Sequence, residues 1–430
     1  MRTTNLIKAA VIAIFTLPVA VHAQTAPQAP KQCLAPNTPV GTPRGIHPGR
    51  VAWSHAPGAA TWDGSKASAW FDDSCNDYAL CRWLVAATLR NLTGEKLEKR
   101  AWRAIFTYFN AQRGKQGKSY GKGEKIAIKV NNNNTYSHED SREINASPQM
   151  LLALLESLVE EAGVPQQCIT VAEPSRFITD YLYNKCHGRY PGIRFVDNSG
   201  GDGRMKAEYS EGAIRFSKDN GRLARGLATA FTEADYVINM ALLKGHVGQG
   251  VTLCGKNWYG CTSINADWRK NAHNNFDQNR DGTPKYMTFV DFMGHKDLGG
   301  KTLLWLIDGL YGCKNVGGEP GPLWTMDPFN GQWPCSLIGS LDPVAIDMVG
   351  IDLLTSQFPD MPDADYSDMY LIEAAQAGNA PSGTAYDPEG DGTPLKSLGV
   401  AEHWNNATDR QYSRNLGKEE GIELVYERKK

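Results

Sequence analysis

The sequence lacks a cluster of lysine and arginine, and its formal net charge is only −2. Proteins that bind nucleic acid carry such clusters, so we expect no nucleic-acid partner. After the first 23 residues, no stretch reaches the roughly 18 consecutive apolar residues that span a bilayer, so we expect no membrane anchor. No Cys-x-x-Cys pair occurs, although this spacing is typical of zinc-ribbon and iron–sulfur proteins. These absences indicate a globular protein that binds neither nucleic acid nor a metal cluster of those two types.

The first 23 residues have the features of a secretory signal peptide. Arg2 and Lys8 give a basic start, residues 9–21 are apolar, and cleavage is predicted after Ala23. Arg2 stands without a second arginine, so the general secretory route is favoured over twin-arginine export. We therefore expect a periplasmic or secreted protein. Residues 24–45 are rich in proline, alanine, glutamine and threonine, and we expect them to form a disordered leader.

Nine cysteines are present, and some should pair in an oxidising compartment. Cys75 with Cys81 and Cys254 with Cys261 are plausible local disulfides. The sequence alone does not fix the connectivity, and an odd count leaves at least one thiol unpaired.

Strand and helix patterns alternate through most of the remaining chain. Apolar, β-branched runs predict strands at residues 126–130, 169–172, 194–196, 236–240, 303–307 and 336–338. Helical periodicity with capping residues predicts helices at residues 81–91, 94–112 and 147–162, and another that begins at Asp342 with Pro343 in its first turn. Strand, helix and strand within about 50 residues form a βαβ unit, which requires a parallel strand pair.

We expect an α/β fold with a largely parallel or mixed sheet and helices on both faces. Ligands bind such sheets at the carboxyl ends of the strands. The predicted α/β domain covers residues 46–375. Residues 376–430 are predicted to be a loop-rich C-terminal extension that packs on this domain.

One glycine-rich segment, residues 241–274, carries the strongest indication of a site. His246 follows the strand predicted at 236–240, Lys256 lies ten residues later, and His273 another seventeen residues on. Histidine transfers protons near neutral pH or binds a metal, and a partly buried lysine acts as a base or nucleophile. We expect catalytic roles for His246 and Lys256 and a transition-metal ligand at His273. The alternative is that these side chains only bond to loop carbonyls or face solvent.

Three further groups extend the expected site. Lys129, Asn131 and Asn133 lie at or past the end of another strand, and their side chains suit a substrate's hydroxyl or carboxylate groups, although an asparagine run also forms turns. Arg50 could bind a carboxylate or phosphate from the N-terminal side. Asp308 ends the run LLWLIDG and is a candidate base.

Asp277, Asn279 and Asp281 precede Gly282 in the sequence DQNRDG and predict a structural calcium site. A calcium loop of this type ends with a carboxylate at position twelve, where this chain has Thr288. The alternative is therefore a surface turn.

Four motifs resemble the domain of unknown function 362 family. They are IKVN before the βαβ unit, VINMALLKGHVGQGVTLCGKNWYG, LWLIDGLYG and SLDPVAIDMVGIDLL, and they occur in the family's order. The resemblance extends from about residue 44 to about residue 375. Many relatives carry a ferredoxin-like cluster segment, which this chain lacks. The resemblance implies a fold but no defined activity.

The spacing of His246, Lys256 and His273 is also similar to that of the lactate racemase family. That resemblance implies a nickel-pincer nucleotide tethered by Lys256, with nickel bound by His273 and His246 as an acid/base. The sequence GVTLCGKN departs from that family's Gly-Gly-Arg-Lys pattern, and the second interval differs by about one residue. That cofactor is also assembled in the cytoplasm, which fits poorly with export by the secretory route.

Two functions follow from these observations. The first is an enzyme that acts on a small hydroxy acid or sugar derivative by proton or hydride transfer or by hydrolysis. The second is a periplasmic binding protein that captures a small molecule or carbohydrate without turnover. The sequence leaves both open.

Overall fold

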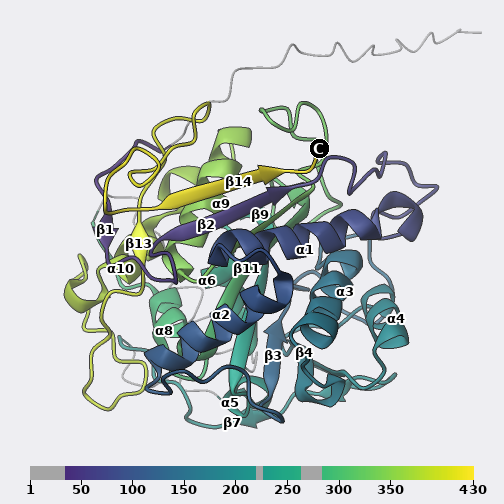
Figure 1. Ribbon diagram of the computed structural model, residues 1–430, viewed down its shortest axis with the longest axis horizontal. Helices are drawn as coiled ribbons and strands as arrows, with labels where there is room; N and C mark the ends of the chain where they lie inside the picture. The colour runs from purple at the N-terminus through teal and green to yellow at the C-terminus, as the bar shows by residue number, and fades with distance from the viewer. Residues whose placement is uncertain (1–33, 219–225, 263–282) are drawn as a thin grey trace, which may run out of the picture.

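The computed structural model of the protein describes residues 34–218, 226–262 and 283–430. A large mixed sheet crosses the described chain, with its strands in the order β14-β2-β12-β11-β9-β3-β4-β5-β6, and the short strand β10 pairs with β9 (Figure 1). Within this order only β12 runs antiparallel to its neighbours. The expected α/β fold with a largely parallel or mixed sheet is confirmed.

The strands of this sheet are β2 (Arg50–His55), β3 (Ile126–Lys129), β4 (Ile169–Glu173), β5 (Arg194–Asp197), β6 (Met205–Lys206), β9 (Tyr236–His246), β10 (Gly250–Val251), β11 (Thr302–Cys313), β12 (Ser336–Ser340) and β14 (Glu423–Arg428). Two small two-stranded sheets pair β1 (Val40–Gly41) with β13 (Val400–Ala401) and β7 (Tyr209–Ser210) with β8 (Leu227–Ala228).

The α-helices are α1 (Tyr78–Thr93), α2 (Glu98–Gln112), α3 (Pro148–Glu156), α4 (Asp180–Arg189), α5 (Thr229–Thr232), α6 (Cys254–Asn257), α8 (Thr288–Gly294), α9 (Pro343–Gln357) and α10 (Met369–Ala375). Helix α3 continues as the π-helical turn η2 (Ser157–Glu161). Short 3-10 turns are η1 (Asp73–Cys75), η3 (Gln166–Cys168), η4 (Trp258–Cys261), η5 (Gly299–Lys301), η6 (Ala364–Tyr366) and η7 (Ala377–Asn379).

Helices cover both faces of the sheet, and each face has its own hydrophobic core. In β3, Ile126 and Ile128 pack into the core that contains α1, α2, α3 and α4, whereas Ala127 packs into the core that contains α6, α8, α9 and α10. Successive strand side chains point to opposite faces, so a strand that is buried on both sides reads as a continuous apolar run. This is why the central strands could be predicted from the sequence.

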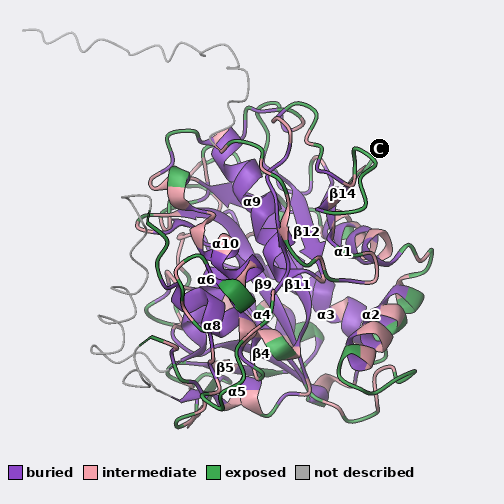
Figure 2. Ribbon diagram, turned by 90° about the vertical axis from the view of Figure 1, so that its left-hand side faces the viewer, coloured by how far each residue is buried: buried purple, intermediate pink, exposed green. Residues whose placement is uncertain are grey.

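Helix α9 is buried along almost its whole length (Figure 2). The C-terminal segment covers it, because Trp404 and Tyr412 belong to the same core as α9. Strand β14 then pairs with β2 at the edge of the large sheet. The proposed boundary at residue 375 remains a prediction, but the chain beyond it completes both a core and a sheet.

Two predicted strands are longer in the structure. Strand β9 continues past residue 240 to His246, because it pairs with β11 through Lys244 and with β10 at Gly245 and His246. Strand β11 extends from the predicted 303–307 to Thr302–Cys313. Residues 40–41, within the segment expected to be a disordered leader, pair with β13.

The predicted disulfides Cys75–Cys81 and Cys254–Cys261 are not formed in the structure. The eight cysteines of the described chain are free thiols, and all are buried. The Cys75 thiol donates to Ser68 Oγ at 3.5 Å and the Cys254 thiol to the Leu306 carbonyl at 3.5 Å. Local spacing failed as a guide because these side chains have separate packing partners. Cys33 lies outside the described residues.

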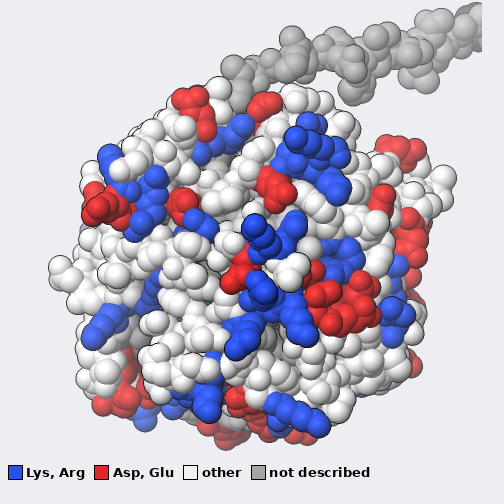
Figure 3. All heavy atoms as spheres, in the orientation of Figure 1, with Lys and Arg blue, Asp and Glu red and all other residues white. Residues whose placement is uncertain are grey.

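Within the three described ranges, no helix is long and apolar enough to cross a membrane. On the face shown in Figure 3, lysine and arginine side chains gather in front of the sheet, and aspartate and glutamate side chains lie beside them. The surface charge on this face is therefore mixed.

Candidate functional site

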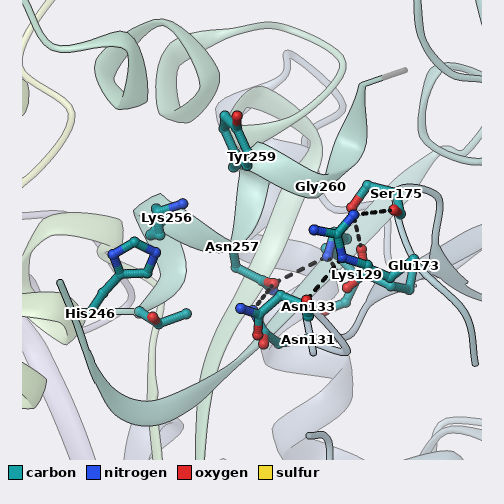
Figure 4. Close-up of a pocket in the computed structure, with 12 residues that line it drawn as sticks. Lys129, Asn131, Asn133, Glu173, Ser175, His246, Lys256, Asn257, Tyr259 and Gly260 are labelled. Carbon is teal, nitrogen blue, oxygen red and sulfur yellow. Dashed lines mark hydrogen bonds and ion pairs between the residues drawn. The ribbon is translucent and has the colours of Figure 1, made fainter. Parts of the chain in front are cut away.

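A cavity of about 110 Å³ opens at the carboxyl ends of β3 and β4, against the turn formed by α6 and η4 (Figure 4). Its described lining residues are Lys129, Asn131, Asn133, Glu173, Ser175, Arg176, His246, Thr252, Lys256, Asn257, Tyr259 and Gly260. Five of these residues, Lys129, Asn131, Asn133, His246 and Lys256, are site residues predicted from the sequence. They come from two segments more than 100 residues apart, which meet because β3 and β9 are parallel neighbours.

A buried ion pair forms one wall of the cavity. Lys129 Nζ lies 2.8 Å from Glu173 Oε2, and the two side chains are only 1% and 2% exposed. The ammonium group also donates to the Val130 carbonyl at 2.6 Å and to Asn257 Oδ1 at 3.1 Å. Three acceptors therefore match its three hydrogens. The structure places Lys129 at the cavity, as predicted, but its hydrogen-bonding capacity is already used by the protein.

Glu173 is equally well bonded. Its Oε2 accepts a hydrogen bond from the Asn132 amide at 3.0 Å, and its Oε1 accepts one from Ser175 Oγ at 3.1 Å. A buried carboxylate is tolerated when it is paired and hydrogen-bonded in this way. The pair therefore connects the end of β3 to the end of β4.

Asn257 extends this network into α6. Its Oδ1 accepts from Lys129 Nζ and from Asn131 Nδ2 at 3.0 Å, and its Nδ2 donates to Asn239 Oδ1 at 2.8 Å. The buried Asn257 amide thus fixes the position of α6 relative to β3 and β9. Lys256 is its neighbour in the same helical turn.

Gly260 is a place where a side chain would not fit. A Cβ atom there would lie 2.6 Å from Glu173 Oε1, 3.0 Å from Ser175 Oγ and 3.1 Å from Lys129 Nζ. The backbone of η4 therefore approaches the ion pair as closely as only glycine allows.

The Lys256 amine lies against aromatic rings. Its Nζ is 4.2 Å from the ring centroid of Tyr259 and 5.8 Å from that of Phe289, and the residue is 7% exposed. A ring face attracts a cation, so Tyr259 offers the Lys256 ammonium group a favourable contact. In Figure 4 the amine and the imidazole of His246 lie on the same side of the cavity.

His246 ends β9 and is half-buried, with Nδ1 hydrogen-bonded to the Val247 carbonyl at 2.5 Å. On the other side, Arg176 Nε donates to the Asn133 carbonyl at 2.9 Å. Arginine and lysine side chains in the described lining outnumber carboxylates by three to one, before His246 is counted. The cavity is therefore suited to an anion.

A second buried lysine lies behind the cavity. Lys244 Nζ donates to Asn133 Oδ1 at 2.7 Å, and the residue is completely buried. Burial lowers the pKa of Lys244 to about 7. Its hydrogen bond fixes the orientation of the Asn133 amide, which lines the cavity.

Two predicted site residues do not line the cavity. The Asp308 carboxylate is buried and accepts from the Leu310 amide at 3.0 Å and from the Ser147 amide at 3.0 Å, so it joins β11 to the start of α3. Burial raises the pKa of Asp308 to about 6. Arg50 forms a two-pronged ion pair with Glu423 of the neighbouring strand β14. Both residues have structural partners in place of a ligand.

Several lining residues were not predicted from the sequence, among them Glu173, Ser175, Arg176 and Asn257. Glu173 ends β4, and Ser175 and Arg176 follow it. Polar residues at or after the end of a parallel strand were the signal that identified Asn131 and Asn133 after β3. The same criterion applied to the sequence EPSR would have found them.

His273 and the predicted calcium ligands Asp277, Asn279 and Asp281 lie outside the described residues. Within the part of the chain that the structure describes, no group of three or more histidine, cysteine, aspartate or glutamate side chains could hold a metal ion. The transition-metal and calcium sites stay predictions.

The sequence profile of a family described as "Domain of unknown function (DUF362)" matches residues 126–352, which is more than half of the chain. The matched region begins at β3 and ends in α9, so it contains every residue that lines the cavity. A search of the curated proteins found no match. The similarity to the lactate racemase family therefore stays a prediction.

Proposed function

The chain belongs to the family described as Domain of unknown function (DUF362), and because that description names no activity, we propose from the cavity itself that the protein is an enzyme acting on a small hydroxylated anion. A hydroxy acid or an acidic sugar derivative is the proposed substrate class. The observation that carries this proposal is the convergence of His246, Lys256 and Arg176 with uncharged amide side chains in one cavity.

Charge and size support the choice of ligand. Lysine, arginine and histidine side chains attract a carboxylate or phosphate, and amide groups donate to and accept from hydroxyl groups. The cavity volume of about 110 Å³ suits a small molecule better than a polymer.

Proton transfer is the proposed chemistry, because an imidazole carries it out near neutral pH without a metal or cofactor. His246, which is half-buried at the end of β9, is the proposed proton acceptor and donor. Lys256, whose amine lies against the Tyr259 ring, is the proposed cation that stabilises negative charge developing on the substrate. Lys129, Glu173 and Asn257 hold the wall in place.

Exchange of carbon-bound hydrogen in D2O tests this proposal. Hydroxy acids and sugar acids are incubated with the protein, and deuterium incorporation beside the carboxylate is followed by NMR. We expect His246→Gln to slow exchange by about 10²–10⁴-fold, which is the usual contribution of a general acid or base. Arg50→Met, which removes a cation far from the cavity, is the control and should exchange like the wild type.

Binding without exchange would contradict the enzymatic proposal. If wild-type protein binds an acid of this panel and Lys256→Met does not, while no substrate exchanges hydrogen, the cavity captures a metabolite without turning it over. If nothing binds, the proposed ligand class is wrong.

We also propose that the protein is exported, on the basis of the signal-peptide features of its first 23 residues. Burial of the eight described thiols would shield them from oxidants in such a compartment. N-terminal sequencing of the mature protein should begin at Gln24, and a start at Met1 would contradict export.

A further inference from the structure

Helix α6 is a single turn of four residues, Cys254–Asn257, and it carries two cavity residues, Lys256 and Asn257. So short a helix has little stability of its own. Its N-cap residue, Leu253, has no side chain that can accept a hydrogen bond from the first amides. The amides at the start of α6 therefore need acceptors from elsewhere in the fold.

Asp347 of α9 provides these acceptors. Its Oδ1 accepts from the Cys254 amide at 2.8 Å, and its Oδ2 accepts from the Gly255 amide at 2.8 Å. The Tyr370 hydroxyl of α10 also donates to Oδ2 at 2.8 Å. In the structure Asp347 is completely buried.

Close packing leaves α6 little freedom beside this carboxylate. A Cβ atom at Gly255 would lie 2.6 Å from the Tyr370 ring, and one at Gly350 of α9 would lie 2.7 Å from Leu253 Cδ1. The two glycines allow α6 to approach α9 and α10 closely enough for Asp347 to reach both amides.

We propose that Asp347 is the positioning residue of the site: by binding the first two amides of α6, it fixes Lys256 and Asn257 at the cavity wall. This inference rests on the proposed function for its ligand, but it adds a residue that does not line the cavity. It also explains how α9, at the far end of the matched family region, contributes to the site.

Asp352 offers a matched control on the same helix. It is also buried, and its carboxylate accepts from His403 Nδ1 at 2.7 Å, from the Trp404 amide at 3.0 Å and from the Tyr412 hydroxyl at 2.8 Å. These partners belong to the C-terminal segment and not to α6. Asp352→Asn therefore removes a buried charge of α9 without touching the cavity wall.

The test compares Asp347→Asn with Asp352→Asn in the full chain. An asparagine at position 347 keeps one acceptor but turns an NH2 group toward the second amide. Three quantities are measured: the thermal unfolding midpoint, the affinity for glycerate, which is a small hydroxy acid, and the rate of backbone amide hydrogen exchange in the peptide 253–258. We expect both variants to lose stability. Only Asp347→Asn should bind glycerate at least about tenfold more weakly and show faster amide hydrogen exchange in this peptide.

Equal affinities in the two variants, or weaker binding in Asp352→Asn alone, would overturn the inference. If wild-type protein does not bind glycerate, the ligand proposal fails separately.

The position of Lys256 can then be tested without a ligand, by the rate at which an amine-reactive reagent modifies its side chain, measured by peptide mass. This rate should rise in Asp347→Asn only, and an unchanged rate would refute the role. If Asp347→Asn does not fold, Tyr370→Phe replaces it, because it removes the hydrogen bond from Tyr370 to Asp347. Amide hydrogen exchange should then be faster in peptide 253–258 and unchanged in peptide 423–428.

Discussion

Removing both members of the buried Lys129–Glu173 ion pair should cost less stability than the sum of the costs of removing each one alone. In Lys129→Met, Glu173 keeps only the Asn132 amide and the Ser175 hydroxyl as hydrogen-bond partners, and its charge stays buried without a counter-ion. In Glu173→Gln, the ammonium group of Lys129 keeps only uncharged acceptors, and its charge stays buried without a counter-ion. Loss of one partner from such a pair costs about 3–5 kcal/mol.

The double variant Lys129→Met/Glu173→Gln leaves no isolated charge. Its loss of unfolding free energy should therefore be smaller than the sum of the two single losses by at least about 2 kcal/mol, as expected for directly interacting groups. The coupling energy is obtained by unfolding the wild type, the two single variants and the double variant with denaturant. The free energy of unfolding should depend on denaturant concentration with the same slope in all four proteins.

The pair Lys125–Glu233 provides the control cycle. Its atoms lie 3.7 Å apart, and its side chains are 46% and 65% exposed. Exposed pairs contribute less than about 1 kcal/mol, so this cycle should show little coupling. If the Lys129 and Glu173 losses are additive, or if the exposed pair couples as strongly, our description of the cavity wall is wrong.

Three further predictions concern single positions around the site. Gly260→Ala places a methyl group 2.6 Å from Glu173 Oε1 and should cost about 1–3 kcal/mol in unfolding experiments; an unchanged stability would show that η4 can move away. Burial raises the pKa of Asp308 to about 6, above its unfolded value, so the stability of the wild type relative to Asp308→Asn should fall by about 2 kcal/mol from pH 4 to pH 6; a flat difference would contradict the raised pKa. Burial lowers the pKa of Lys244 to about 7, so the stability of the wild type relative to Lys244→Met should instead rise between pH 7 and pH 9, by about 1.4 kcal/mol per pH unit; a decrease would refute burial as the cause.

Local sequence patterns predicted the central elements well. The strand at β3 and the helix α9 were found because an apolar run and a capping residue are local signals. The Asp342 side chain accepts from the Val344 and Ala345 amides, as its position before Pro343 predicted. The length of β9 was underestimated, because its last residues are held by pairing with β10 and β11, and such pairing has no local signal.

The site was only partly predictable for a similar reason. Lys129, Asn131, His246 and Lys256 were found because they lie at or beyond the carboxyl ends of predicted strands, and these ends meet at one edge of the sheet. Asp308 satisfied the same criterion, yet its carboxylate is used by the amides at positions 147 and 310. The position of a residue along the chain gives the edge of the sheet that it reaches, but not the partners of its side chain.

The role of Asp347 could not be derived from the sequence at all. A helix that begins at Asp342 includes Asp347, but nothing in the local sequence indicates that α6 lies against that side of the helix. Only the tertiary packing of α6, α9 and α10 brings its carboxylate to two backbone amides. Residues that hold the lining residues in place without lining the cavity are therefore harder to predict than the lining residues themselves.

A crystal structure of the protein with bound glycerate tests the central claim most directly. We predict that the carboxylate lies within hydrogen-bonding distance of Lys256 Nζ, about 3 Å, with a hydroxyl group beside His246. Glycerate bound at another surface, or a cavity that stays empty at saturating glycerate, would contradict the assignment of this cavity as the functional site.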